Sequence, residues 1–141
     1  MAVNLKQNAD GSMGLQGTDG DDGGFIVATY SWTPTSDADV SFFVANRKYR
    51  VKAIVARIDT VDGAATTATI RKAPSATAIA SGTALHSSTI NLNTGAATNQ
   101  TLTLSTTSTD LDIAAGDCIG IDFSAAMTGA YGSVNVTLAP A

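Results

Sequence analysis

A short acidic stretch near the N-terminus, GTDGDDGG at residues 17–24, has the residue types of a calcium-binding loop. Helix-flanked calcium loops place oxygen ligands at alternate positions, a Gly at the sixth and a Glu at the twelfth. Counted from Asp19, the sixth residue is Gly24, but the twelfth is Tyr30. Two interpretations remain open: an irregular loop in which three carboxylates converge on one ion, or a flexible charged tether. The carboxylates concerned are Asp19, Asp21 and Asp22. We favour the tether and predict no metal site.

Catalytic side chains are scarce. The chain has one histidine, His86, and one cysteine, Cys118, and all twelve acidic residues are Asp. No G-x-S-x-G elbow and no cysteine-nucleophile signature is present, and one His with one Cys cannot complete a four-ligand zinc site. The Gly-rich stretch lacks the Lys-Ser/Thr of a phosphate loop. We therefore predict no enzyme activity and no cofactor, with His86 on the surface or structural and Cys118 a small buried hydrophobe.

Positive charge is concentrated in one part of the chain. Five of the eight Lys and Arg residues fall within residues 47–57, and Arg71 and Lys72 follow on what we expect to be the neighbouring strand. One interpretation is an ordinary solvated sheet face. The other is a basic patch that meets an acidic partner, for which a neighbouring copy has suitable aspartates. The candidate partner contacts are Arg47, Lys48, Arg50, Lys52, Asp19, Asp21 and Asp22.

Length and charge limit the classes of function. A chain of 141 residues suits one domain. A net charge of -4 argues against general nucleic-acid binding, which needs a basic surface. The sequence contains no run of eighteen apolar residues, so we predict no membrane span. The N-terminus lacks the charged-then-apolar order of a secretory signal.

The composition predicts an all-β fold. Thr and Val favour strands, Gly, Asp, Asn and Ser favour turns, and Glu, a good helix former, is absent. We expect residues 1–24 to form a flexible Gly/Asp-rich arm and residues 25–141 to form a single jelly-roll-like β-sandwich of about eight strands. The expected strands are 25–32, 40–45, 49–59, 66–72, 88–92, 99–105, 111–113, 118–123 and 133–140.

The clearest strand, YRVKAIVARID at residues 49–59, changes its pattern along its length. Its first half alternates apolar and basic residues, whereas after Ala53 both faces are apolar. The strand therefore either enters a doubly covered position or bends at a β-bulge.

Most of the chain from residue 25 onward resembles a known family. The runs ATIRKAPSATAIASGTALHSSTINL, TNQTLTLS and LDIAAGDCIGIDFS, with the ending VNVTLAPA, resemble small capsid decoration (cement) proteins of tailed bacteriophages. The closest likeness is to the cement proteins of short-tailed phages that infect Bordetella and related hosts. The resemblance rests on patterning and length, and no family motif assigns roles to single residues.

The resemblance implies a jelly-roll protein on the exterior of the virion, made in the bacterial host cytoplasm. Its implied partners are the phage major capsid protein and itself, as a homodimer at capsid symmetry axes, with no nucleic acid or membrane bound. The implied function is to staple neighbouring capsid subunits against internal DNA pressure, and the arm is expected to wrap a neighbour. The alternative is a carbohydrate- or host-receptor-binding module of a phage fibre or tail. Sugar sites commonly use exposed aromatics, for which the candidates are Tyr30, Trp32 and Tyr131.

Overall fold

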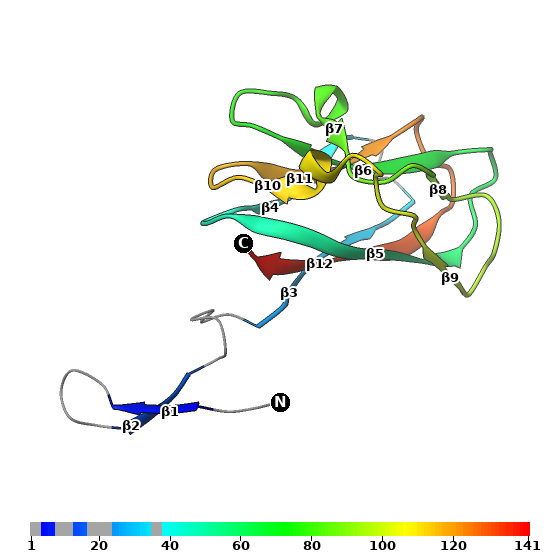
Figure 1. The fold of residues 1–141 in the computed structure, drawn as a ribbon. Helices are drawn as coiled ribbons and strands as arrows, with labels where there is room; N and C mark the ends of the chain where they lie inside the picture. The colour runs from blue at the N-terminus through cyan, green and yellow to red at the C-terminus, as the bar shows by residue number, and fades with distance from the viewer. Residues whose placement is uncertain (1–3, 8–12, 17–23, 35–37) are drawn as a thin grey trace.

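The computed structural model describes residues 4–7, 13–16, 24–34 and 38–141. From residue 24 onward, the described chain forms two antiparallel sheets of five strands each, packed face to face (Figure 1). The predicted all-β sandwich is confirmed. None of the described helices has the length and apolar character needed to cross a bilayer.

The first sheet has the strand order β10-β5-β12-β3, and β9 pairs with β5 beside β10. Its longest strands, β5 and β12, form the centre of the sheet, and β3 lies at one edge. The strands are β3 (Ile26–Trp32), β5 (Tyr49–Thr60), β9 (Thr98–Thr101), β10 (Asp112–Ile113) and β12 (Tyr131–Pro140).

The second sheet has the order β4-β11-β6-β7, and β8 pairs with β6 beside β7. Two short 3-10 helices, η1 (Ile79–Ser81) and η2 (Ser108–Leu111), lie in the connections. The strands are β4 (Val40–Val44), β6 (Thr67–Ala73), β7 (Thr83–Ala84), β8 (Ile90–Asn91) and β11 (Cys118–Phe123).

This strand order is that of a jelly roll. Successive strands cross between the sheets, from β3 to β4, β5 and β6, and from β10 to β11 and β12. The short strands β7 and β8 share one edge position of the second sheet, and β9 and β10 share one edge position of the first. The described strands of the sandwich therefore fill eight jelly-roll positions, as the sequence predicted.

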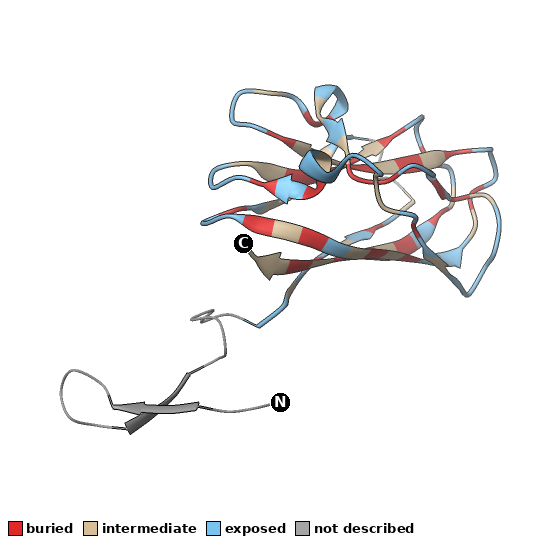
Figure 2. Cartoon of the chain, viewed as in Figure 1, coloured by how far each residue is buried: buried red, intermediate tan, exposed pale blue. Residues whose placement is uncertain are grey.

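The core lies between the sheets, where buried residues alternate with less buried ones along the strands (Figure 2). On β11, Ile119, Ile121 and Phe123 are buried, and on β12 Val134 and every second residue after it are buried up to Leu138. Both alternations follow the period-two pattern of apolar residues in the sequence. Such period-two burial is what a strand shows when only one of its faces is covered by the opposite sheet.

The change of pattern in β5 is a β-bulge. The consecutive β12 residues Thr137 and Leu138 pair with Ala53 and Val51, so Lys52 is the extra residue. Buried positions of β5 are odd-numbered before the bulge and even-numbered after it. Of the two alternatives for this strand, the structure therefore shows the bulge.

The expectation that Arg71 and Lys72 lie on the strand next to β5 is wrong. They lie on β6, which belongs to the opposite sheet, because the jelly-roll connection after β5 crosses the sandwich. Arg71 pairs with Asp122 of β11 at 2.7 Å. The Lys72 ammonium donates to the carbonyl oxygens of Thr109 and Asp112. Both cations thus stabilise the sandwich itself.

The predicted arm contains two described strands, β1 (Asn4–Gln7) and β2 (Met13–Gln16). They pair antiparallel with each other, with Leu5 opposite Leu15. Figure 1 draws them apart from the two sheets. The acidic stretch at 17–23 lies outside the described residues.

Candidate interaction surfaces

The structure brings the four candidate basic contacts to one end of β5. Arg47 and Lys48 are exposed in the turn between β4 and β5, and Lys52 is exposed at the bulge. The side chains of these three make no hydrogen bond or ion pair within the described part of the chain. We call them the cationic corner. The other candidates, Asp19, Asp21 and Asp22, lie outside the described residues.

Arg50 differs from its neighbours because it is already engaged. Its guanidinium contacts the Asp112 carboxylate at 2.5 Å and the hydroxyl of Ser108 at 3.0 Å. These contacts tie β5 to η2 and β10 at the edge of the first sheet. Arg50 is therefore placed to hold the sandwich together, and its guanidinium is less available to a partner than the cationic corner.

Every carboxylate in residues 24–34 and 38–141 has a partner within the chain. Three form ion pairs with Arg, and the other four accept hydrogen bonds from backbone or hydroxyl groups. The seven Asp in these ranges are balanced by seven Lys and Arg, so the net charge of -4 belongs to the rest of the chain. Although the protein is acidic, the charged side chains of the described sandwich that have neither an ion pair nor a hydrogen bond are the three cations of the corner. The seven carboxylates are Asp39, Asp59, Asp62, Asp110, Asp112, Asp117 and Asp122.

One side of the sandwich is apolar and incompletely covered. It is formed by β3 and β4, each of which lies at the edge of its sheet and has one described strand partner. The Tyr30 and Phe42 rings stack there with centroids 5.6 Å apart and remain half-buried. We call this surface the β3–β4 side. Its apolar members are Phe25, Ile26, Val27, Tyr30, Val40, Phe42, Phe43 and Val44.

The exposed fractions identify this side as unusual. Phe25 is 68% exposed, Val27 56% and Val44 66%, and these are three of the four large apolar residues that are exposed in the described chain. A soluble monomer rarely leaves a contiguous apolar surface of this kind open, so it is typical of an interaction site. Sequence reasoning missed it, although neither 24–34 nor 40–45 contains a charged residue.

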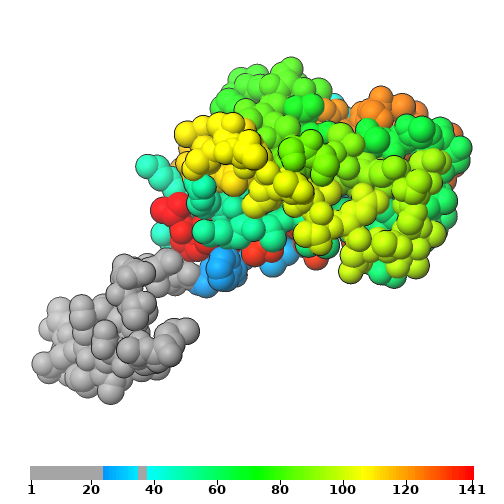
Figure 3. All heavy atoms as spheres, turned by 45° about the vertical axis from the view of Figure 1, so that its right-hand side comes forward, coloured from blue at the N-terminus to red at the C-terminus, as the bar shows by residue number. Residues whose placement is uncertain are grey.

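The cationic corner adjoins the β3–β4 side. β4 ends at Val44, immediately before the turn that carries Arg47 and Lys48, and β3 begins at the same end of the sandwich. Figure 3 shows the start of β3, the turn after β4 and the C-terminal end of the chain gathered on one side of the molecule. Apolar and cationic groups therefore meet at one end of this side.

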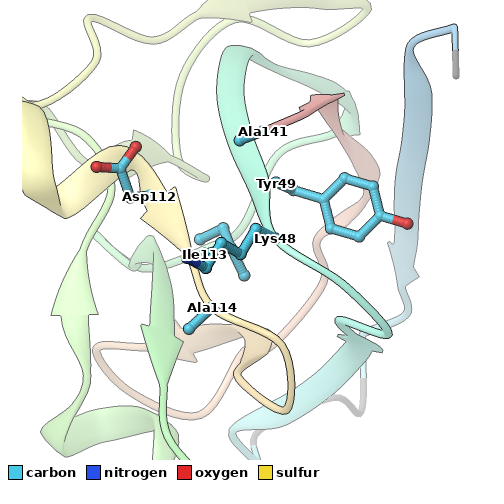
Figure 4. A pocket seen from close by; sticks show the side chains of 6 residues that line it. All are labelled: Lys48, Tyr49, Asp112, Ile113, Ala114 and Ala141. Atoms are coloured by element: carbon cyan, nitrogen blue, oxygen red, sulfur yellow. The ribbon is translucent and has the colours of Figure 1, made fainter. Parts of the chain in front are cut away.

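A pocket of about 340 Å³ lies behind the turn, between β5, β10 and the end of β12. Figure 4 shows Lys48 beside Ile113, with the Tyr49 ring directed away from the other lining residues. The tyrosine hydroxyl donates to Asn46 at 2.7 Å, which fixes the ring on the far side of the strand. Asp112 is held by Arg50, so Lys48 is the one lining side chain whose charge is not paired within the described chain.

His86 is a structural residue. Its ring is buried between β7 and β8, where Nε2 accepts a hydrogen bond from the backbone N–H of Ile70 at 2.8 Å. Nδ1 lies against the carbonyl oxygen of Ser88 and must donate to it. Burial lowers the pKa of His86, and the nearby Arg71 charge acts in the same direction, against the opposing effect of the Ser88 bond. The imidazole is thus held neutral, in one tautomer.

Asp62 accepts more hydrogen bonds from protein groups than any other carboxylate of the described chain. It is 2% exposed and accepts hydrogen bonds from the hydroxyls of Thr66 and Thr128 and from the amides of Gly63, Thr128 and Gly129. The Thr66 hydroxyl, followed by the Thr128 hydroxyl, holds the pKa of this carboxyl far below its usual value, although burial opposes them. Asp62 therefore joins the β5–β6 turn to the β11–β12 connection.

The three aromatic candidates for a sugar site do not form a platform. Trp32 is 1% exposed and meets the edge of Phe123, and Tyr30 is half-buried against Phe42. Tyr131 is 49% exposed at the start of β12. One exposed ring is less than the stacked aromatic surface expected of a carbohydrate site.

Comparison with known proteins identifies no family. No family model matches the chain, and no curated protein matches it. Among solved structures, a chain from the structure of the infectious bursal disease virus Gx strain is similar with 16% identity and a TM-score of 0.29. That likeness covers 97% of this chain and 36% of the other, so this chain spans about a third of its length. A TM-score this low supports no argument about function.

Proposed function

We propose that this chain is a capsid decoration protein of a tailed bacteriophage. In this proposal it binds the outer surface of the assembled head, associates with copies of itself, staples neighbouring major capsid subunits and catalyses no reaction. The observation that carries the proposal is the β3–β4 side with its adjoining cationic corner. An exposed apolar surface of this kind is stabilised when a partner protein covers it. The sequence resemblance suggests that the partner is in a phage head.

The stabilisation follows from linkage. A protein that contacts two capsid subunits at once binds the assembled head and not the separated subunits. Binding at a free concentration of 100 times Kd then stabilises each site by about 2.7 kcal/mol. Many identical sites related by capsid symmetry act together, so modest contacts resist the pressure of packaged DNA.

The cationic corner would orient the protein on the head. Arg47, Lys48 and Lys52 are exposed and unpaired in the described chain, so they suit a partner surface rich in carboxylates. Complementary charges of this kind raise the association rate and fix the orientation more than they add affinity. Binding to heads should therefore weaken as salt is raised.

The β1–β2 hairpin would supply a second contact. A two-stranded hairpin is marginally stable in water and gains stability by packing against another surface. In the proposal the hairpin packs on a capsid subunit next to the one that the sandwich binds. A rigid domain and a tethered hairpin can thereby bridge two subunits.

The proposal is tested by adding the purified chain to heads that lack it and measuring the bound fraction by co-sedimentation. Wild-type protein should saturate, whereas the Arg47→Ala, Lys48→Ala, Lys52→Ala triple variant should bind at least about tenfold more weakly, a loss of about 1.4 kcal/mol. Arg57→Ala is the matched control, since Arg57 is exposed but pairs with Asp59. If wild-type protein ignores heads but binds immobilised glycans, the proposal is wrong and the receptor-binding alternative replaces it.

A further inference from the structure

We infer that the β3–β4 side is the seam of a two-fold symmetric dimer, in which the β3 strands of two copies pair antiparallel and extend the first sheet across both. This inference specifies the surface for the self-association in the proposed function. Its test needs no capsid, so failure of the dimer and failure of head binding are distinguishable.

The first reason is that β3 is an unprotected edge. Natural sheets guard their edges with charged residues, proline, bulges or very short strands. β4 has a bulge at Phe42, because Ile119 pairs with Phe43 and the next residue, Gly120, pairs with Ser41. The other two edges of the described sandwich are divided into the short strands β7 with β8 and β9 with β10.

Within the described part of the chain, β3 has none of these guards. It is seven residues long, its pairing with β12 is regular from Ile26 to Trp32, and its sequence IVATYSW contains no charge and no proline. A regular, neutral edge of this length is a template for another strand.

The second reason is the apolar surface beside that edge. On the inner face of the sheet, Tyr30 of β3 stacks on Phe42, and both rings are half-buried. On the outer face, Val27 of β3 is exposed. A second copy that pairs along β3 would cover this surface with the same residues of its own. Both surfaces are uncharged, so their contact buries no like charges.

The third reason is that the two ends of the side carry opposite charge. Arg47 and Lys48 follow β4 at one end, and Asp39 precedes β4 at the other. The Asp39 carboxylate accepts a bond from the Phe123 amide but has no cation partner in the described chain. β4 has five residues, so the two ends are separated by about 17 Å at 3.3 Å per residue.

Antiparallel pairing about a two-fold axis exchanges these ends. It brings Arg47 and Lys48 of each copy toward Asp39 of the other, and this happens twice in the dimer. The single Asp39 charge offsets one of the two cations, so a net positive charge that includes Lys52 remains for the capsid contact of the proposed function. A parallel arrangement would instead place the two cationic corners together. In the antiparallel arrangement the two cationic corners would lie at opposite ends of the seam, and the length of β4, about 17 Å, exceeds the roughly 8 Å screening length of physiological salt. Charge complementarity therefore selects a second copy in the antiparallel orientation as the occupant.

The test is sedimentation velocity of the full chain over a range of concentrations, without capsids. Wild-type protein should reach a dimer. Thr29→Lys, at the middle of β3, should weaken dimerisation at least tenfold because it places like charges near the axis. Thr101→Lys is the matched control: Thr101 is exposed on β9, at the opposite edge of the same sheet. Circular dichroism checks that both variants fold.

A second pair of variants tests the orientation. Arg47→Asp with Lys48→Asp should also weaken the dimer, and adding Asp39→Asn to that variant should restore part of the loss. The asparagine keeps an acceptor for the Phe123 amide and removes the repulsion. Wild-type protein that stays monomeric, or a dimer that Thr101→Lys disrupts and Thr29→Lys does not, would overturn the inference.

Discussion

The imidazole of His86 occupies the place of a missing strand carbonyl opposite Ile70. Its Nε2 accepts the Ile70 amide at 2.8 Å, in the gap between β7, which pairs with Arg71 and Lys72, and β8, which pairs with Thr67 and Ala68. A buried amide without a partner costs on the order of 1–3 kcal/mol. A neutral side chain thus completes the edge of the second sheet.

The first prediction concerns the pH dependence of this contact. The folded pKa of His86 lies below its unfolded value of 6.5, so its contribution to stability is complete above pH 6.5 and is lost as the pH falls through the folded pKa. Urea unfolding of the wild type should therefore show falling stability below pH 6.5. His86→Gln, which keeps an acceptor and a donor, should remove this dependence. Equal pH profiles for the two proteins would contradict it.

Asp62 gives a second prediction. Asp62→Ala leaves five donors without their acceptor, among them the hydroxyl of the buried Thr66, so we expect a loss of about 3 kcal/mol in the free energy of unfolding. Because the folded pKa is depressed, the contribution of Asp62 is present above its usual pKa of 3.8 and is lost as the pH falls further. Asp59→Asn, at an exposed carboxylate, is the control and should change stability by about 1 kcal/mol or less.

Gly132 gives a third prediction, about packing. A Cβ at this position would lie 2.3 Å from the Arg57 carbonyl oxygen and 2.4 Å from the Trp32 ring. Neither the backbone of the central strand β5 nor a fully buried indole can move away readily, so Gly132→Ala should cost about 1–3 kcal/mol. Gly24→Ala, where a Cβ meets no atom within 4 Å, is the control. Thermal unfolding that is the same for both variants would show that the core adapts more than the structure indicates.

The arm gives a fourth prediction. Deleting residues 1–24 removes the β1–β2 hairpin, which pairs with itself, and leaves the sandwich strands intact. The melting temperature should therefore change little, while occupancy on heads should fall by about tenfold or more, because the linked second contact is lost. Unchanged occupancy would mean that the hairpin does not bind the head.

The alternation of single strands was predictable, and so was the fold class. In VNVTL of β12 and IGIDF of β11, the alternation of apolar with small or polar residues indicates which side chains point inward. It does so because one face of each strand packs against the core and the other does not. The bulge at Lys52 was anticipated as one of two alternatives, since the phase of the apolar pattern shifts there. These features depend on neighbours within a few residues.

The interaction surfaces were less predictable because they depend on strand order. The segment FIVATYSW has the same pattern whether its strand is central or at an edge, and its position at an edge is set by the pairing of β12 with β3. The role of Asp62 depends on Thr128 and Gly129, which are distant in the sequence. In the sequence Arg50 belongs to a run of basic residues, and its ion pair with the distant Asp112 is evident only in the folded structure.

The most direct test of the proposed function is a cryo-electron microscopy reconstruction of heads to which the purified chain has been added back. Additional density is expected on the capsid exterior, with the jelly roll over one subunit and the N-terminal segment reaching a neighbouring subunit. A reconstruction without additional exterior density, at protein concentrations that saturate the wild-type dimer, would contradict the proposed function.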